Sequence, residues 1–488
     1  MSPFQNIGKN VLRRIETLGA DFGELCVQER TRSMIIFRGE KEESNTKVNE
    51  KGISVKVIVK GTAGFCSFPE VTKEKALKAV EWAVKEAKLL KQIHPSQYVD
   101  YEPKVDKVEY PALIPPFSLD QRDKSSFLHE SLKPFLGSRY VGRILLNYQD
   151  TTTKELYMNT EGAEIESIYS RVYLRPTIYA KRNNKEINFS KEFGKIGGFE
   201  FIKDNVWKVC SEVRNVAVKM LDAVRFPTNG IYSVVLGESA MGALLHILSH
   251  SLEADMIIAG LSPFEHNYHR EVAPECVNVF DDSTIPHAWG SYKYDAEGVL
   301  GKRKYLIKNG ILESFLHSRE SAFEFHVKPT ANSRRDSYKY PPRIHCSNIH
   351  LQPGECSFDD LIDDIDHGLY IKEGRDISYV DEVVTTIRKS LLPSGVMYLK
   401  NLKCSPKQSA LSTAIMKVDE AYLIEKGEIR HPIKGFYLVF DLEKMLKSID
   451  RIGKVTAEYV SNCFKNGDYL PFSAVAPMTR VGEVKICV

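Results

Sequence analysis

The order in which helical and strand patterns follow one another is the feature of this sequence that most limits its fold. Apolar residues recur at helical spacing over residues 9–20, and alternating β-prone runs follow, the clearest over 52–59. Helix-then-strand order returns further along the chain. The later elements we expect are an extended connection over 92–118, a helix near 119–135, strands from 140 to 179, a helix over 198–224, a strand over 232–236 and a helix around 239–258. Helices, strands and hairpins in this mixed order predict an α+β protein rather than a doubly wound parallel sheet.

Two local patterns predict their elements most sharply. Thr72 precedes a run of lysines, glutamates and alanines, and apolar residues recur there every three or four positions, as on the buried face of a helix. That buried stripe consists of Ala76, Ala79, Val80, Ala83, Val84 and Ala87. Further on, Asn309-Gly310 lies between two apolar runs within 304–316. This dipeptide favours a two-residue turn and predicts a β-hairpin.

The length of the chain predicts two domains. A single hydrophobic core stops growing well below 488 residues, so a chain of this size divides. The best boundary is the turn-rich sequence Phe-Pro-Thr-Asn-Gly at 226–230. We therefore expect an N-terminal α+β domain over 1–225 and a C-terminal, β-rich domain over 226–488.

Charge and cysteine usage limit the classes of function. The net charge of +3 arises from 67 basic and 64 acidic residues, which gives no case for binding nucleic acid or a membrane surface. The N-terminus lacks the pattern of a secretory signal, and no apolar run is long enough to span a bilayer. The nine cysteines are scattered without a C-x-x-C pair. That spacing predicts reduced thiols in a cytoplasmic protein.

One segment, GESAMGALLHILSHSLEAD at 237–255, carries a pattern that suits metal chemistry. His246 and His250 are four residues apart, so on an α-helix both imidazoles would project from one face, as a chelating pair requires. Glu253 follows three residues later on the same face. It offers a carboxylate for ligation, for orienting a histidine or for proton transfer.

Histidines at this spacing also occur by chance, and the pattern alone leaves that alternative open. The chain has 13 histidines, and helical histidines often satisfy only local hydrogen bonds. Two other pairs illustrate the point. His266 and His269 lie in a polar, loop-like stretch, while His345 and His350 flank an expected strand. We predict surface positions for both of these pairs.

The same segment resembles a known family, and the likeness extends over nearly the whole chain. VVLGESAMGALLHILSHSLEAD is similar to the signature of the TldD/PmbA family, in which a strand leads into a helix bearing His-Glu-x-x-x-His-x-Leu-Glu-x-Asp. Ordered matches lie at 20–28, 51–68, 280–312, 332–354, 419–436 and 461–486. The resemblance implies a two-domain fold with mixed, mostly antiparallel sheets and flanking helices. It also implies a zinc peptidase.

The family's zinc ligands are the two motif histidines and a late cysteine. Carried over residue by residue, they are His246, His250 and Cys463, with Cys463 lying in the similar segment SNCFKNGDYLPF. Two imidazoles and a thiolate leave a fourth position for water or a substrate carbonyl, as in a catalytic zinc site. Zn²⁺ is therefore the cofactor that the resemblance implies.

The motif departs from the family pattern in two ways. One residue is lost between the histidines, so they are four apart rather than five and converge on a regular helix without a bulge. Ile247 occupies the place of the glutamate that takes a proton from water in such peptidases. Glu253 is the nearest substitute for that base, although its position in the family motif suits orienting a ligand. A further departure is the longer, more basic stretch at about 380–415.

Two functions remain open from the sequence. The first is a zinc peptidase that cleaves unstructured peptides, held as an added strand inside the cavity of a dimer. The second is a zinc-binding but non-catalytic subunit of the PmbA type, which would serve as partner to an active TldD-like chain. The resemblance implies a homodimer or a heterodimer with a paralogue. A third activity, modulation of DNA gyrase, rests on the family's historical name and finds no support in charge or motif.

Overall fold

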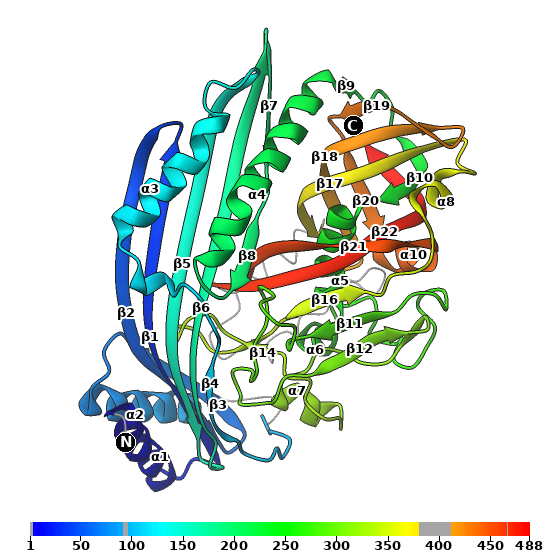
Figure 1. The fold of residues 1–488 in the computed structure, drawn as a ribbon. Coiled ribbons are helices and arrows are strands. Elements are labelled where there is room, and N and C mark those ends of the chain that lie inside the picture. The colour runs from blue at the N-terminus through cyan, green and yellow to red at the C-terminus, as the bar shows by residue number, and fades with distance from the viewer. Residues whose placement is uncertain (1–2, 91–95, 380–410, 466) are drawn as a thin grey trace.

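The structure is a computed structural model that describes residues 3–90, 96–379, 411–465 and 467–488. Two large sheets dominate the described residues, and helices pack against each of them (Figure 1). The predicted α+β class is confirmed. The altered stretch at 380–415 falls mostly outside the described residues.

The first sheet has eight strands within the described residues. They are β1 (Phe22–Arg38), β2 (Lys41–Val59), β3 (Thr62–Phe68), β4 (Val105–Glu109), β5 (Val141–Asn159), β6 (Glu164–Arg182), β7 (Lys185–Ser190) and β8 (Phe193–Ile196). Their order is β3-β2-β1-β5-β6-β4, with β7 and β8 also paired to β6. All pairs are antiparallel except β4 with β6. The expected connection over 92–118 thus contains an edge strand, β4.

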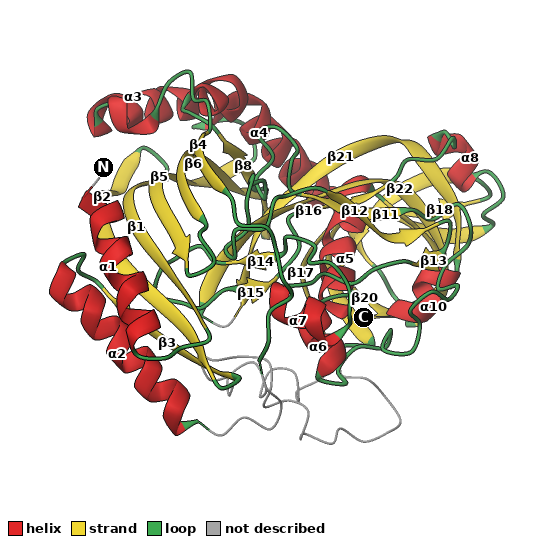
Figure 2. Cartoon of the chain, turned by 90° about the horizontal axis from the view of Figure 1, so that it is seen from below, coloured by secondary structure: helices red, strands yellow, loops and turns green. Residues whose placement is uncertain are grey.

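Four helices cover one face of this sheet: α1 (Pro3–Thr17), α2 (Lys73–Leu89), α3 (Gln121–Leu132) and α4 (Glu200–Lys219). Helices α1 and α2 pack on one end of the long strands, and α3 and α4 on the other. Viewed from below, α1 and α2 lie outside the first sheet, and the second sheet lies on its other side (Figure 2). Helix α2 confirms the prediction closely. The Thr72 side chain caps it by accepting from the Lys75 amide, and its buried residues are the six of the predicted stripe.

Strand β1 runs without interruption through a polar middle. Its odd-numbered apolar residues face the helices, while its even-numbered polar residues face the C-terminal half of the chain. Arg30, for example, is buried and donates to a carboxylate oxygen of Asp336 at 2.9 Å. Because both faces of the strand are covered, the polar middle stays in the sheet.

The second sheet has twelve strands within the described residues. They are β9 (Val224–Arg225), β10 (Gly230–Leu236), β11 (Val279–Asp282), β12 (Arg303–Lys308), β13 (Ile311–Leu312), β16 (Asn348–Leu351), β17 (His367–Tyr379), β18 (Thr413–Glu425), β19 (Glu428–Lys434), β20 (Tyr437–Asp441), β21 (Ile449–Lys465) and β22 (Asp468–Cys487). The short strands β14 (Ser333–Arg334) and β15 (Arg343–Ile344) pair separately. Most pairs are antiparallel, and β10–β17, β16–β22 and β9–β19 are parallel. The predicted mixture of mostly antiparallel sheets is confirmed.

The hairpin predicted at Asn309-Gly310 is present between β12 and β13. Both turn residues have positive φ, 49° for Asn309 and 77° for Gly310, as the favoured two-residue turn requires. The sheets change between β8 and β9, close to the predicted domain boundary at 225/226. That the two parts are separate domains stays a prediction.

The helix expected around 239–258 is broken in the structure. It forms α5 (Glu238–Ser251) and α6 (Ala254–Ile258), with Leu252 and Glu253 between them. At the break the backbone bonds to Leu316, whose amide donates to Leu252 O at 2.8 Å and whose carbonyl accepts from Ala254 N at 3.0 Å. Pairing with a distant segment thus interrupts the helix at these two residues. The remaining short helices are α7 (Arg319–Glu324), α8 (Phe358–Ile362) and α10 (Leu442–Lys447).

Candidate metal centre

Helix α5 carries both motif histidines inside the C-terminal half of the chain. All its residues from Ala240 to Ser251 are buried, where it packs on β17, β21 and β22. The helix comes unusually close to β21 at Gly242, where an added Cβ would lie 2.7 Å from the Cβ of Tyr459. A side chain at position 242 would therefore push the helix away from the strand. Glycine permits the approach that brings the histidines near the C-terminal part of β21.

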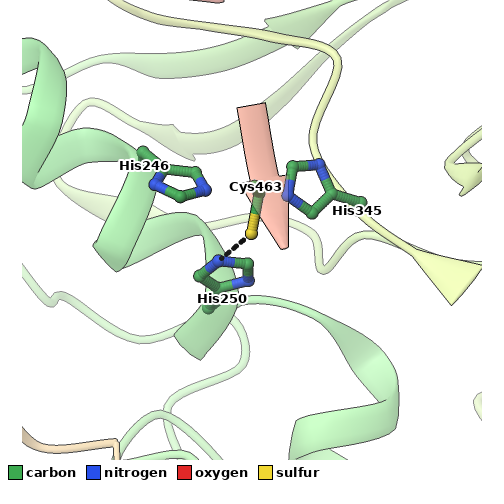
Figure 3. A group of neighbouring side chains, drawn as sticks. All are labelled: His246, His250, His345 and Cys463. Atoms are coloured by element: carbon green, nitrogen blue, oxygen red, sulfur yellow. Dashed lines mark hydrogen bonds between the residues drawn. The ribbon is translucent and has the colours of Figure 1, made fainter. Parts of the chain in front are cut away.

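The structure brings the three predicted ligands together. The rings of His246 and His250 have centroids 4.7 Å apart on a regular helix, so they converge without a bulge. Cys463 projects from β21 between them, with its Sγ 3.4 Å from His250 Nε2 (Figure 3). That these side chains bind a metal stays a prediction, but the sequence argument about their spacing agrees with the geometry.

His345 joins the same cluster, and its predicted surface position is wrong. Its side chain is fully buried, and one ligand atom from each of His246, His250, His345 and Cys463 lies within 4.8 Å of the others. Figure 3 shows His345 facing the helix from the opposite side of Cys463. Sequence spacing gave no signal, since His345 follows β15 far along the chain from α5. The adjacent pair His345-Cys346 was the one local hint.

Of the other three histidines predicted at the surface, two are exposed and one is half-buried. His266 and His269 are exposed, as predicted. His350 is half-buried and stacks on Phe280, with ring centroids 4.7 Å apart, so its predicted surface position is also wrong. His345 and His350 lie before and within β16. This strand pairs on both sides, with β11 and β22, so it lies inside the second sheet and not at its surface.

Glu253 contacts His250 on the side of the ring away from Cys463. Its Oε1 lies 2.8 Å from His250 Nδ1, whereas Cys463 approaches Nε2. A carboxylate at Nδ1 holds the proton there and leaves the Nε2 lone pair for a metal. This contact suits a residue that positions His250, and the role of Glu253 as a base stays a prediction. The predicted alternative, a base acting on water, would need the carboxylate on the cavity side of the cluster.

A buried lysine completes this group. Lys465 Nζ donates to Glu253 Oε2 and to the Ile344 carbonyl, each at 2.6 Å, and lies 3.4 Å from Asp255 Oδ2. All three charged side chains are nearly fully buried. Burial raises the pKa of Asp255. Burial lowers the pKa of Lys465, but the negative charges of Asp255 and Glu253 outweigh this effect and raise it overall. Sequence reasoning missed Lys465, although it is two residues from Cys463.

Aromatic packing fixes the other histidine. The ring of His246 stacks on Phe472 with centroids 3.7 Å apart and planes within 12°. Phe472 is itself buried on β22, the partner strand of β21. His246 thus packs against β22, the strand paired with the one that carries Cys463.

Ile247, in the position of the family's glutamate, is 4 % exposed and lines a cavity beside the cluster. The cavity has a volume of about 340 Å³ and is bordered by 458–464 of β21, 373–378 of β17 and the segment 189–192. Its wall also carries five carboxylates, namely Glu192, Glu373, Asp376, Asp419 and Glu458. Burial raises the pKa of Glu373 to about 7 and that of Asp419 to about 6. The cavity wall thus carries carboxylates that can exchange a proton near neutral pH.

Two findings bear on compartment and membrane. The eight cysteines among the described residues are free thiols, in line with the prediction of reduced cysteines. Within the same part of the chain, no helix is both long and apolar enough to cross a bilayer.

Comparison with known proteins places this geometry in a family. Residues 23–87 match domain 1, residues 114–221 the central domain, and residues 229–401 with 378–487 the C-terminal domain of the PmbA/TldA metallopeptidases. A metalloprotease of Methanocaldococcus jannaschii is 29% identical over 465 residues, covering 94% of this chain and 96% of that protein. A zinc metalloprotease TldD homologue of Saccharolobus solfataricus is 22% identical, covering 97% and 98%.

The fold also resembles that of a crystal structure. A protein of Thermotoga maritima, described as a candidate modulator of a DNA gyrase, superposes with a TM-score of 0.74 at 18% identity. The match covers 99% of this chain and 100% of that protein. At this identity the likeness shows a shared fold.

Proposed function

Because the chain belongs to the PmbA/TldD metallopeptidase family, we propose that it is a zinc-dependent peptidase that hydrolyses peptide bonds in unstructured peptides. The observation that carries the proposal is the buried group of His246, His250 and Cys463 on the wall of a cavity. The metalloprotease names of its relatives support the same reaction class.

The residues present fit zinc. Bonds of about 2.0–2.3 Å in a tetrahedral site separate the ligand atoms by roughly 3.3–3.8 Å. The donor atoms here already lie within 4.8 Å of one another, so small side-chain adjustments would suffice. Imidazole nitrogens with a thiolate are a donor set that suits zinc better than magnesium or calcium. When bound, the zinc would polarise a scissile carbonyl and lower the pKa of a water.

The surrounding residues hold this donor set in place. Glu253 fixes the tautomer of His250, and Lys465 in turn holds Glu253 through its second carboxylate oxygen. Phe472 fixes the plane of His246. Outer contacts of this kind pre-organise a metal site, because the ligands need little reordering when the ion binds.

An extended peptide suits the cavity because the cavity follows the edge of β21. Seven consecutive residues, 458–464, border it, although successive side chains of a strand point to opposite faces. The cavity must therefore lie along the strand's edge. Within the described residues β21 pairs over 456–465 with β22 alone, and the Trp289 indole donates to one edge carbonyl, that of Ser461, at 3.2 Å. Main-chain pairing at such an edge favours unstructured substrates of varied sequence.

The proton acceptor has to differ from that of the family motif. Ile247 has no ionisable group, and Glu253 is turned to the far side of His250. We assign the role to the carboxylates of the cavity wall as a group. They border the space in which the substrate would lie.

The assembly and the compartment belong to the same proposal. We expect a dimer, with itself or with a paralogue, that encloses the cavity, and no nucleic acid or membrane as partner. Free cysteines suit the cytoplasm, where thiols stay reduced. Light scattering on the purified chain, alone and mixed with a paralogue, would establish the assembly.

The test of function is zinc content together with cleavage of a reduced and alkylated, unfolded protein. We expect about one zinc per chain and hydrolysis. His246→Ala should lose both, whereas the exposed control His269→Ala should keep both. Full zinc without cleavage, alone or with a paralogue, would reject the peptidase and favour the non-catalytic partner. A chain that takes up no zinc would reject the ligand set.

A further inference from the structure

We propose that His345 is a fourth protein ligand of the metal, so that the chain builds a four-ligand site rather than one with a position left open. The proposal rests on the metal site of the proposed function. It concerns a residue outside the His246, His250 and Cys463 set that the family resemblance implies.

The position of the ring supports ligation. The centroid of His345 lies 5.3 Å from that of His250 and 5.6 Å from that of His246, on the opposite side from α5 (Figure 3). Its ligand atom lies within 4.8 Å of those of the other three residues. The loop between β15 and β16 thus adds a fourth donor, His345, opposite the two histidines of α5 and the cysteine of β21.

The free nitrogen of His345 is the one that faces the cluster. Its Nδ1 lies 2.8 Å from the carbonyl oxygen of Cys346 and, at the longer distance of 3.3 Å, from Arg334 Nη1, which itself donates to that carbonyl. Donation from Nδ1 to this carbonyl leaves Nε2 with its lone pair. Within the described residues, His345 Nε2 is buried and has no hydrogen-bond partner.

Leaving a buried nitrogen without a partner is unfavourable, and a bound metal would remove that cost. The competing explanation is that ring packing alone buries the Nε2 atom of His345. His350 is an example of a histidine packed in this way. Its Nε2 is also buried without a partner in the described chain, but its ring stacks on Phe280 and is not part of the cluster. His345 differs because three other donors surround its free nitrogen. His350 therefore serves as the matched control.

Four protein ligands change what the site can do. A tetrahedral zinc held by four side chains is closed, whereas catalytic zinc keeps one position for water or substrate. In this chain a substrate carbonyl would need a fifth position, or the position that His345 gives up. The proposed peptidase then depends on the mobility of one histidine.

The test uses Co²⁺ as a spectroscopic probe of the purified chain. We expect a tetrahedral spectrum for the wild type that added azide leaves unchanged. His345→Ala should bind Co²⁺ and Zn²⁺ at least about tenfold more weakly, and azide should shift its visible bands. His350→Ala should behave as the wild type does.

His345→Cys adds an independent readout, which does not depend on loss of binding. A second thiolate ligand should strengthen the sulfur-to-cobalt charge-transfer band in the near ultraviolet. An unchanged band in His345→Cys, or unchanged affinity and spectrum in His345→Ala, would overturn the fourth-ligand assignment while leaving the proposed function intact. Failure of the wild type itself to bind either metal would instead reject the proposed function.

Discussion

Replacing Glu253 by glutamine separates its two possible roles. In the structure, both carboxylate oxygens accept from donors, Oε1 from His250 Nδ1 at 2.8 Å and Oε2 from Lys465 Nζ at 2.6 Å. Glutamine has one accepting end and one donating end. If its oxygen faces the charged lysine, its amide group faces His250 Nδ1 and favours the tautomer protonated at Nε2. That tautomer removes the lone pair that Cys463 and the metal would face.

The expected loss follows from this tautomer shift. Removal of a carboxylate that orients a ligating histidine typically weakens metal binding by about 10–100-fold, or about 1.4–2.8 kcal/mol. Competition of Glu253→Gln with a chromophoric chelator at neutral pH measures the shift directly. Asp255→Asn is the matched control, because Asp255 also approaches Lys465, at 3.4 Å, whereas the carboxylate that bonds to His250 Nδ1 is that of Glu253. We expect its zinc affinity to stay near that of the wild type.

Turnover at saturating zinc provides the second readout. A positioning residue leaves cleavage per bound zinc largely intact once the site is filled, whereas loss of a general base lowers it by about 10²–10⁴-fold. The reasoning is refuted if Glu253→Gln keeps normal zinc affinity and loses cleavage by that factor. Glu253 would then take a proton in the reaction itself, although in the structure its carboxylate contacts His250 Nδ1, on the far side of the ring from Cys463.

Three further predictions concern neighbouring residues. Burial raises the pKa of Glu373 from 4.5 to about 7, so between these pH values the folded state binds a proton that the unfolded state has lost, and stability falls as pH rises. Glu373→Gln should therefore raise the melting temperature at pH 8 and leave it nearly unchanged at pH 4. Lys465→Met leaves the carboxylates of Glu253 and Asp255 buried without their cation, which should cost about 3–5 kcal/mol in urea unfolding at neutral pH and less in acid, where they can be protonated; an unchanged urea midpoint would show that the cation is not needed. Ile247→Glu places a carboxylate on the cavity wall and should raise the cleavage rate, whereas Ile247→Gln, of the same size but without a base, should not; equal rates for the two variants would contradict this.

Local patterns predicted the elements whose stability is local. Helix α2 follows from its capping threonine and from apolar residues at helical spacing, and the β12–β13 turn follows from two residues that tolerate positive φ. The convergence of His246 and His250 is of the same kind, because one turn of helix determines it. These features need no knowledge of the rest of the chain.

Features that depend on distant partners could not be predicted in this way. The break between α5 and α6 arises because Leu316 bonds to the backbone on both sides of Glu253. The polar middle of β1 stays in the sheet because Asp336 pairs with Arg30. His345 reaches the cluster only because β16 lies inside the second sheet. Each case joins residues far apart in sequence, and no spacing rule connects them.

The departures from the family motif would act on the proposed zinc site in two opposite ways. Shortening the spacing to four residues lets His246 and His250 chelate on an undistorted helix, and His345 adds a nitrogen to the same group. Both changes favour holding the metal. Ile247, in contrast, removes a proton acceptor from the cavity wall beside His246. In the function we propose, the site would therefore combine stronger retention of the ion with weaker activation of water, and the rate of peptide cleavage would be set by how readily His345 withdraws and by which wall carboxylate takes the proton.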